Sequence, residues 1–184
     1  MPERLVLDAS AALAFLRGER RGADVAELLA RHLATGGAVI VPGIFWLEVT
    51  NVLVRRHSLS IEDVLAALRY LDEFGIETVD GDRSLTILGL DLTMTHGLSA
   101  YDAAYLALAV AEDARLLTVD ARLDRAGGER SALRAGGEGS ALGHPRGFHE
   151  APSAYGSPAV MDALATHGAF LAELRRQVEA GVLR

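Results

Sequence analysis

The stretch from Leu98 to Glu112, LSAYDAAYLALAVAE, holds the longest apolar run of the chain and places one acid near its start. Ser99 followed three residues later by Asp102 is an N-terminal capping pattern, so the sequence predicts a helix from Ala100 to Glu112. The apolar run is far shorter than the roughly 20 residues that a membrane-spanning helix needs. We therefore expect a buried helix of a globular protein with no membrane span, and we expect Asp102 in its first turn.

Around this helix, short β-branched and leucine-rich runs alternate with helical patterns, which is typical of βα units on a parallel sheet. Strands are predicted at Leu5 to Leu7, Ala38 to Val41, Ile76 to Val79 and Leu116 to Val119. The other helices are expected to begin near Ser10, before Val25, after Pro42, after Ser60, near Arg83 and after Asp120. The helix after Ser60 has apolar residues at helical spacing that should face the core, namely Ile61, Val64, Leu65, Leu68 and Leu71. The fold class is therefore α/β, with a central parallel sheet.

The composition changes after residue 126. Residues 127–158 are rich in Gly, Ser, Pro and His, which indicates a linker or a long loop. Residues 159–184 contain a helical pattern to about Ala180 with an apolar face. We expect one domain over residues 1–126, a linker over 127–158 and a C-terminal helical extension over 159–184.

The charged residues exclude several classes of function. All 18 basic residues are arginine, and the net charge is −7, which argues against a general nucleic-acid coat that binds through a cationic surface. Without lysine, the chain lacks the residue that receiver domains, haloacid-dehalogenase-like phosphatases and P-loop nucleotide sites place beside phosphate. No cysteine is present, which excludes disulfides and thiolate metal sites and fits the cytoplasmic location that we expect.

Four acids are predicted to meet at one edge of the sheet. Asp8 and Asp120 each follow directly on a predicted strand, and the carboxyl ends of parallel strands line the ligand crevice in open sheets. Glu48 lies on the helical face of Phe45 and Val49, where a core side chain would be expected. Asp102 begins its helix at the same end of the sheet. The four carboxylates are therefore candidates for one site.

Each acid also has a purely structural explanation. The two acids that follow strands can act as N-terminal caps of the helices after them. Asp102 can complete a capping box with the serine three residues before it. Glu48 can pair with Asn51 or Arg55 on its own helix.

A cluster of four acids nevertheless needs a counter-charge. Two carboxylates about 5 Å apart repel each other by roughly 3 kcal/mol at an effective dielectric near 20. A divalent cation removes this conflict, and oxygen ligands without cysteine favour Mg²⁺ or Mn²⁺. Such ions promote phosphodiester hydrolysis by activating water and neutralising phosphate charge. The cluster therefore predicts metal-dependent phosphodiester chemistry.

Four stretches that carry these acids resemble, in order and spacing, the four acidic motifs of PIN domains. They are LVLDASAAL at Leu5 to Leu13, WLEVTNVL at Trp46 to Leu53, LSAYDAAYLALA at Leu98 to Ala109 and LTVDARL at Leu117 to Leu123. The closest subgroup is the VapC-type toxins of bacterial toxin-antitoxin pairs. The resemblance covers roughly residues 3 to 126, and the third stretch is its most specific part.

This resemblance implies a PIN-like three-layer α/β/α domain and an Mg²⁺- or Mn²⁺-dependent endoribonuclease acting on RNA. It also implies a homodimer and inhibition by a VapB-type antitoxin. Asp8, Glu48, Asp102 and Asp120 match the metal-binding acids of the family, while two neighbouring hydroxyl residues match supporting positions, namely Ser10 and Thr118. The alternative is a non-catalytic PIN-like module that binds a partner protein. The chain departs from the family after the fourth motif: members usually close with a short edge strand there, whereas a glycine-rich segment and an extra helix follow in this sequence.

Overall fold

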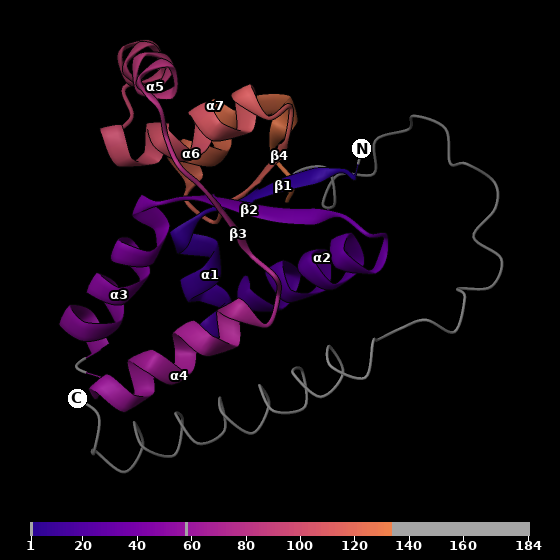
Figure 1. Cartoon of the computed structure of the whole chain (residues 1–184), viewed down its shortest axis with the longest axis vertical. Coiled ribbons are helices and arrows are strands. Elements are labelled where there is room, and N and C mark those ends of the chain that lie inside the picture. The colour runs from indigo at the N-terminus through magenta and orange to yellow at the C-terminus, as the bar shows by residue number, and fades with distance from the viewer. Residues whose placement is uncertain (1, 58, 134–184) are drawn as a thin grey trace, which may run out of the picture.

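Four parallel strands form the centre of the molecule in the computed structural model, which describes residues 2–57 and 59–133 (Figure 1). Their order across the sheet is β3-β2-β1-β4. The strands are β1 (Arg4–Leu7), β2 (Ala38–Pro42), β3 (Glu77–Val79) and β4 (Arg115–Leu117). Each neighbouring pair is parallel, with Leu5 opposite both Val39 and Arg115. All four predicted strands are thus present.

Helices cover both faces of this sheet. Figure 1 shows α5, α6 and α7 on one side and α1 to α4 on the other. The bounds of the helices are α1 (Ala9–Leu16), α2 (Gly22–Ala34), α3 (Ile44–His57), α4 (Ile61–Asp72), α5 (Arg83–His96), α6 (Ala100–Ala111) and α7 (Ala121–Gly127). The predicted three-layer α/β/α architecture is therefore confirmed.

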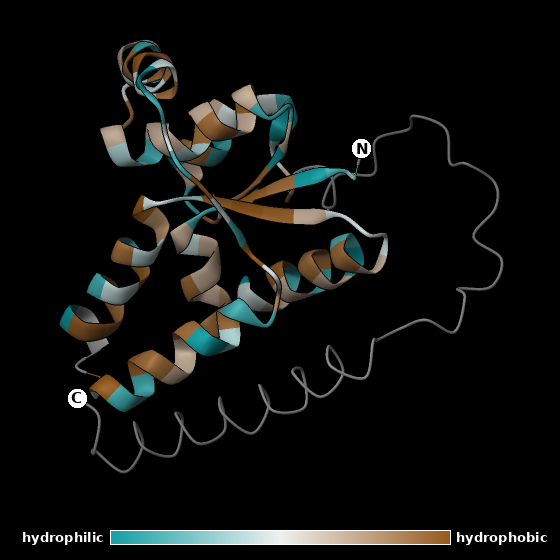
Figure 2. Ribbon diagram, viewed as in Figure 1, coloured by the Kyte–Doolittle hydropathy of each residue, from teal (hydrophilic) through white to brown (hydrophobic). Residues whose placement is uncertain are grey.

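The core lies between the sheet and the helices that touch it. Leu5, Val6 and Leu7 of β1 are all buried, and the middle parts of the two central strands are brown in Figure 2. A parallel sheet covered on both faces needs such continuous apolar strands. At the margin, β3 differs, because Glu77 and Thr78 are exposed.

Local signals fixed the helix ends. The Ser60 hydroxyl accepts from the Asp63 amide at 3.1 Å and donates to the Asp63 carboxylate at 2.8 Å, as the capping pattern predicted. Helix α5 ends at Gly97 in the left-handed conformation with φ 62°, which glycine adopts without steric cost. These two boundaries are confirmed.

The predicted inner face of α4 was partly wrong. Ile61 and Leu65 are exposed, at 75% and 44%, while Ala67 and Tyr70 are buried with Val64 and Leu71. The physical reason is an aromatic cluster below α4. Tyr70 stacks on Phe15 with ring centroids 5.7 Å apart and meets Phe74 edge-on at 5.3 Å, which turns the helix away from the expected orientation.

The chain continues past α7 with a 3-10 turn over Gly128–Arg130 and a single parallel bridge between Ser131 and Leu116. The Ala132 amide donates to the Leu116 carbonyl at 2.8 Å, so this segment adds one residue to the β4 edge. The remainder of the predicted linker and the predicted C-terminal helix lie outside the described residues. In the part of the chain that the structure describes, no helix is long and apolar enough to span a membrane.

Candidate active site

Asp8 follows β1 directly and is 5% exposed. Its carboxylate oxygen Oδ2 accepts from the Thr118 hydroxyl at 2.7 Å, from the Ser10 amide at 3.2 Å and from the Ser10 hydroxyl. The bond to the Ser10 amide is the N-terminal cap of α1, so the structural explanation of Asp8 as a cap is correct. The acid nevertheless stands in a buried setting that a surface cap does not need.

Ser10 and Thr118 join the ends of β1 and β4. Their hydroxyl oxygens are 3.2 Å apart, and the Val119 amide donates to the Ser10 hydroxyl at 3.2 Å. The Thr118 hydroxyl accepts from the Asp120 amide at 3.0 Å while donating to Asp8. Ser10 lies inside α1 and Thr118 lies just after β4, so Ser10 is not a helix cap and Thr118 is not part of the strand. Together they tie the backbone at Asp120 to the Asp8 carboxylate.

Glu48 lies in the first half of α3 and is half-buried. Its carboxylate oxygen Oε2 accepts a short hydrogen bond from the Tyr105 hydroxyl of α6. The expected pairing with Asn51 or Arg55 is therefore not the contact that the structure shows. Tyr105 was missed at the sequence level, although it lies three residues after Asp102 and thus on the same face of the helix.

Asp102 lies in the first turn of α6 and is partly exposed. Its amide donates to the Ser99 hydroxyl at 3.0 Å, and its Oδ2 accepts from that hydroxyl at 2.8 Å. The capping box is therefore correct, and it fixes the start of the helix that carries Tyr105.

Asp120 is exposed and caps α7. Its Oδ1 accepts from the Arg122 and Leu123 amides, each at 2.8 Å. Two arginines lie next to it, because Arg21 donates to the Val119 carbonyl at 3.1 Å and Arg122 donates to the Gly97 carbonyl. The edge of the site near Asp120 therefore combines one acid with two cationic side chains.

The electrostatics connect three of these acids. Burial, and to a smaller extent the charge of Glu48, raise the pKa of Asp8 from 3.8 to about 6, against the lowering effect of Ser10 and Thr118. Burial raises the pKa of Glu48 as well, and the charge of Asp102 adds to this effect while Tyr105 opposes it. Glu48 therefore lies close enough to Asp8 to raise the pKa of Asp8, and Asp102 lies close enough to Glu48 to raise the pKa of Glu48. These three acids interact electrostatically.

Residues 5–129 match the family model for the PIN domain. The chain belongs to the PIN domain family. The matched range contains all four predicted acids and ends close to the boundary predicted at residue 126. No curated protein matches the chain.

Solved structures with PIN-like folds resemble this chain at low sequence identity. The Mycobacterium tuberculosis toxin VapC20, which cleaves the sarcin-ricin loop, is 18% identical with a TM-score of 0.55, over 67% of this chain and 95% of that one. A chain of the Rickettsia felis VapBC2 complex bound to promoter DNA is 20% identical with a TM-score of 0.51, over 66% and 92% of the two chains. The Pyrobaculum aerophilum protein PAE2754 is 24% identical with a TM-score of 0.50, over 68% and 79%. These likenesses show the fold.

The donor set of this PIN domain suits a hard cation, because it consists of carboxylate oxygens that repel one another. The burial of Asp8 and the half-burial of Glu48 support this fit, because a carboxylate removed from water is stabilised by a counter-charge. Each of the four acids accepts a hydrogen bond from a protein group. Across residues 2–57 and 59–133, no group of three or more His, Asp or Glu side chains is arranged to hold a metal ion.

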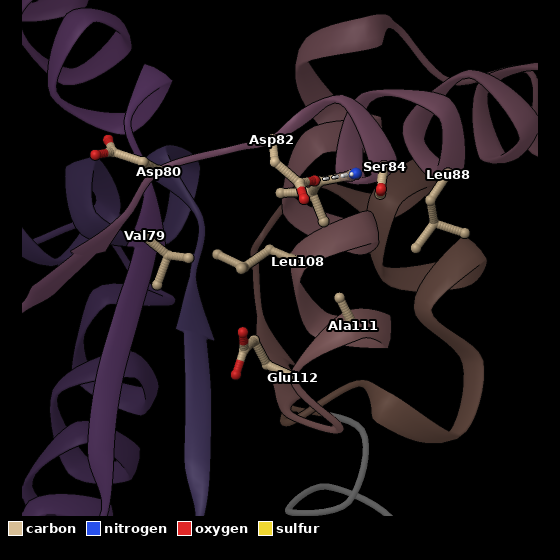
Figure 3. A pocket seen from close by; sticks show the side chains of 9 residues that line it. Val79, Asp80, Asp82, Ser84, Leu88, Leu108, Ala111 and Glu112 are labelled. Atoms are coloured by element: carbon tan, nitrogen blue, oxygen red, sulfur yellow. Dashed lines mark hydrogen bonds between the residues drawn. The ribbon is translucent and has the colours of Figure 1, made fainter.

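A separate pocket of about 380 Å³ lies between β3, α5 and α6 (Figure 3). Its walls are apolar at Leu85, Leu88 and Leu108, and acids occur at its rim. Asp82 is used as the cap of α5, with its Oδ1 accepting from the Leu85 amide at 2.8 Å, and Glu112 is paired with Arg4. None of the four predicted acids lines this pocket, so it is distinct from the candidate site.

Proposed function

We propose that this PIN domain is an endoribonuclease that hydrolyses RNA phosphodiester bonds with the help of Mg²⁺ or Mn²⁺. The observation that carries the proposal is the burial of Asp8 and the half-burial of Glu48, with Asp102 nearby, at the carboxyl edge of the sheet. A fold without a use for these acids would gain stability by replacing the buried one, because burying a carboxylate is unfavourable.

The four acids bind the cations in this proposal, and two hydroxyl residues support one of them. Asp8, Glu48, Asp102 and Asp120 would hold one or two ions, and Ser10 and Thr118 orient the Asp8 carboxylate through their hydroxyls. A bound divalent cation lowers the pKa of a water ligand and neutralises charge on the phosphate. At neutral pH the Asp8 carboxyl is ionised despite its raised pKa of about 6, so it is ready to act as a ligand.

Recruited cations also explain how a chain with net charge −7 approaches a polyanion. Arg21 and Arg122 are both exposed and are held at the Asp120 side of the site by backbone carbonyls. We infer that they contact the RNA backbone, because guanidinium groups suit bidentate contacts to phosphate.

We further propose that the protein is the toxin of a toxin-antitoxin pair, works as a homodimer and is inhibited by a VapB-type antitoxin. The support is a set of large apolar side chains exposed on the same helices, because large apolar side chains gathered on a surface indicate protein contacts. One group lies on α3 and α4 and consists of Leu47, Val54, Ile61 and Leu65. The other lies on α5 and consists of Ile87, Leu90 and Met94.

The direct test is cleavage of a structured RNA by the full chain. The sarcin-ricin loop is a suitable first RNA, because VapC20 cleaves it. We expect cleavage that requires Mg²⁺ or Mn²⁺, stops with chelator and is lost in Asp8→Asn and Asp102→Asn. Asp91→Asn, an exposed acid on α5, is the matched control and should cleave normally.

The competing function is a PIN-like module that only binds a partner protein. Cleavage that persists with chelator or in both acid variants would overturn the metal mechanism. An RNA that stays intact over a panel of substrates, together with a stable complex with a partner protein, would favour the binding module instead. Light scattering of the free protein tests the homodimer independently of catalysis.

A further inference from the structure

Tyr105 is a fully buried tyrosine at the centre of the candidate site. It is 0% exposed, and it lies on α6 one turn below Asp102. Its hydroxyl donates a short hydrogen bond to Glu48 of α3, which is 57 positions away in sequence. This hydroxyl thus connects the two helices that carry Glu48 and Asp102.

Glu48 needs such a partner. A glutamate side chain has several rotatable bonds, and restricting it costs conformational entropy. Asp102 repels the Glu48 carboxylate, and Glu48 in turn repels Asp8, so repulsion favours a rotamer that moves the Glu48 carboxylate away from the site. The Tyr105 hydroxyl opposes this movement, because hydrogen bonds to charged acceptors are stronger than neutral ones.

We propose that Tyr105 is a positioning residue that holds the Glu48 carboxylate beside Asp8 and Asp102, so that divalent cations bind to a prearranged acid. The inference rests on the proposed metal-dependent function and deepens it. Tyr105 acts through Glu48 and does not itself touch the cation or the RNA.

The simpler explanation is that Tyr105 only fills space in the core. Phenylalanine would fill nearly the same volume without the cost of burying a hydroxyl group. The two explanations differ in what they expect of Tyr105→Phe. A space-filling role leaves cation binding unchanged, whereas a positioning role weakens it.

The test is Mn²⁺ binding to the full-length protein, measured by calorimetry without RNA. We expect Tyr105→Phe to weaken Mn²⁺ binding by roughly tenfold or more, as is typical when a group that orients a metal ligand is removed. Tyr70→Phe is the matched control, because Tyr70 is also buried but lies in the aromatic cluster with Phe15 and Phe74. It should bind Mn²⁺ like the unsubstituted protein, and thermal unfolding should show both variants to be folded.

A double-mutant cycle separates positioning from a general disturbance of the fold. In a Glu48→Ala background, Tyr105→Phe should have no further effect on Mn²⁺ affinity, because the carboxylate that it holds is gone. Equal effects of Tyr105→Phe with and without Glu48 would overturn the positioning role. So would unchanged Mn²⁺ affinity in the single variant. If the unsubstituted protein binds no Mn²⁺ at all, the proposed function itself fails, which is a distinguishable result.

Discussion

The two halves of the acid array are built differently. In the inner pair Asp8 is buried and Glu48 is half-buried, and both are held by side-chain hydroxyls, those of Ser10, Thr118 and Tyr105. In the outer pair Asp102 is partly exposed and bonds the capping serine of α6, while Asp120 is exposed and caps α7. Burial raises the pKa of both inner acids.

This difference shows which acids need a functional explanation. A cap at a helix N-terminus stabilises the fold, so the outer pair would be retained in a protein without any ligand. The inner pair destabilises the metal-free fold, because each carboxylate is removed from water near another negative charge. The inner pair is therefore the stronger sign of a binding site.

The largest expected effect comes from neutralising the inner pair. Asp8→Asn should abolish cleavage and yet stabilise the metal-free protein at pH 7. A rise in pKa from 3.8 to about 6 corresponds to up to about 3 kcal/mol of free energy of unfolding. Urea unfolding in chelator measures this gain. Saturating Mn²⁺ should then stabilise the unsubstituted protein more than the variant. If Asp8→Asn is instead less stable than the unsubstituted protein in chelator, the inner pair does not destabilise the metal-free fold.

The same carboxyl gives the fold a specific pH dependence. Because the pKa of Asp8 is higher in the folded state, the folded protein binds the proton more tightly than the unfolded chain between pH 3.8 and about 6. The free energy of unfolding contributed by Asp8 is fully present below pH 3.8 and is lost as the pH rises through about 6. Metal-free unfolding curves at several pH values should show this loss in the unsubstituted protein. In Asp8→Asn the loss should be smaller, since that group no longer titrates.

A smaller effect is expected from the hydroxyls that hold the inner pair. Thr118→Val keeps the shape of the side chain but removes the donor to Asp8 and the acceptor for the Asp120 amide. Leaving buried polar groups without partners costs about 1–3 kcal/mol of unfolding free energy. Chemical denaturation measures the cost, and Thr95→Val, at an exposed position on α5, provides a comparison for the same substitution. Equal stabilities of the two variants would show that the hydrogen bonds of Thr118 to Asp8 and Asp120 do not stabilise the fold.

The smallest stability effect should come from the outer pair. Asp120→Ala removes the cap of α7 and should cost about 1 kcal/mol whether or not a cation is present. Asp82→Ala removes the equivalent cap of α5, outside the candidate site. Both variants should lose similar stability, but only Asp120→Ala should lose RNA cleavage. Loss of cleavage in Asp82→Ala as well would mean that cap loss alone explains the effect.

The sequence predicted the parts of the structure that depend on near neighbours. The boxes at Ser60 and Ser99 and the stop at Gly97 involve residues three or four positions apart, so local pattern was sufficient. The placement of Asp8 and Asp120 followed from strand ends in a parallel sheet.

Contacts between distant elements were not predictable in the same way. The bond between Tyr105 and Glu48 spans 57 positions and depends on how α6 approaches α3. The outward turn of Ile61 depends on an aromatic cluster that includes Phe15 of α1. Ser10 and Thr118 were predicted as supporting residues only through the family resemblance, because nothing local indicates that Thr118 reaches Asp8 across 110 positions.

The shortness of the outermost strands has a consequence for association. β3 has three residues with Glu77 and Thr78 exposed, and β4 has three residues with a single bridge along its outer side. Short, charged margins offer few free backbone groups for another chain to extend the sheet, which protects against fibril-like growth. Self-assembly of this domain is thereby left to its helical surfaces, where side chains rather than backbone hydrogen bonds choose the neighbour.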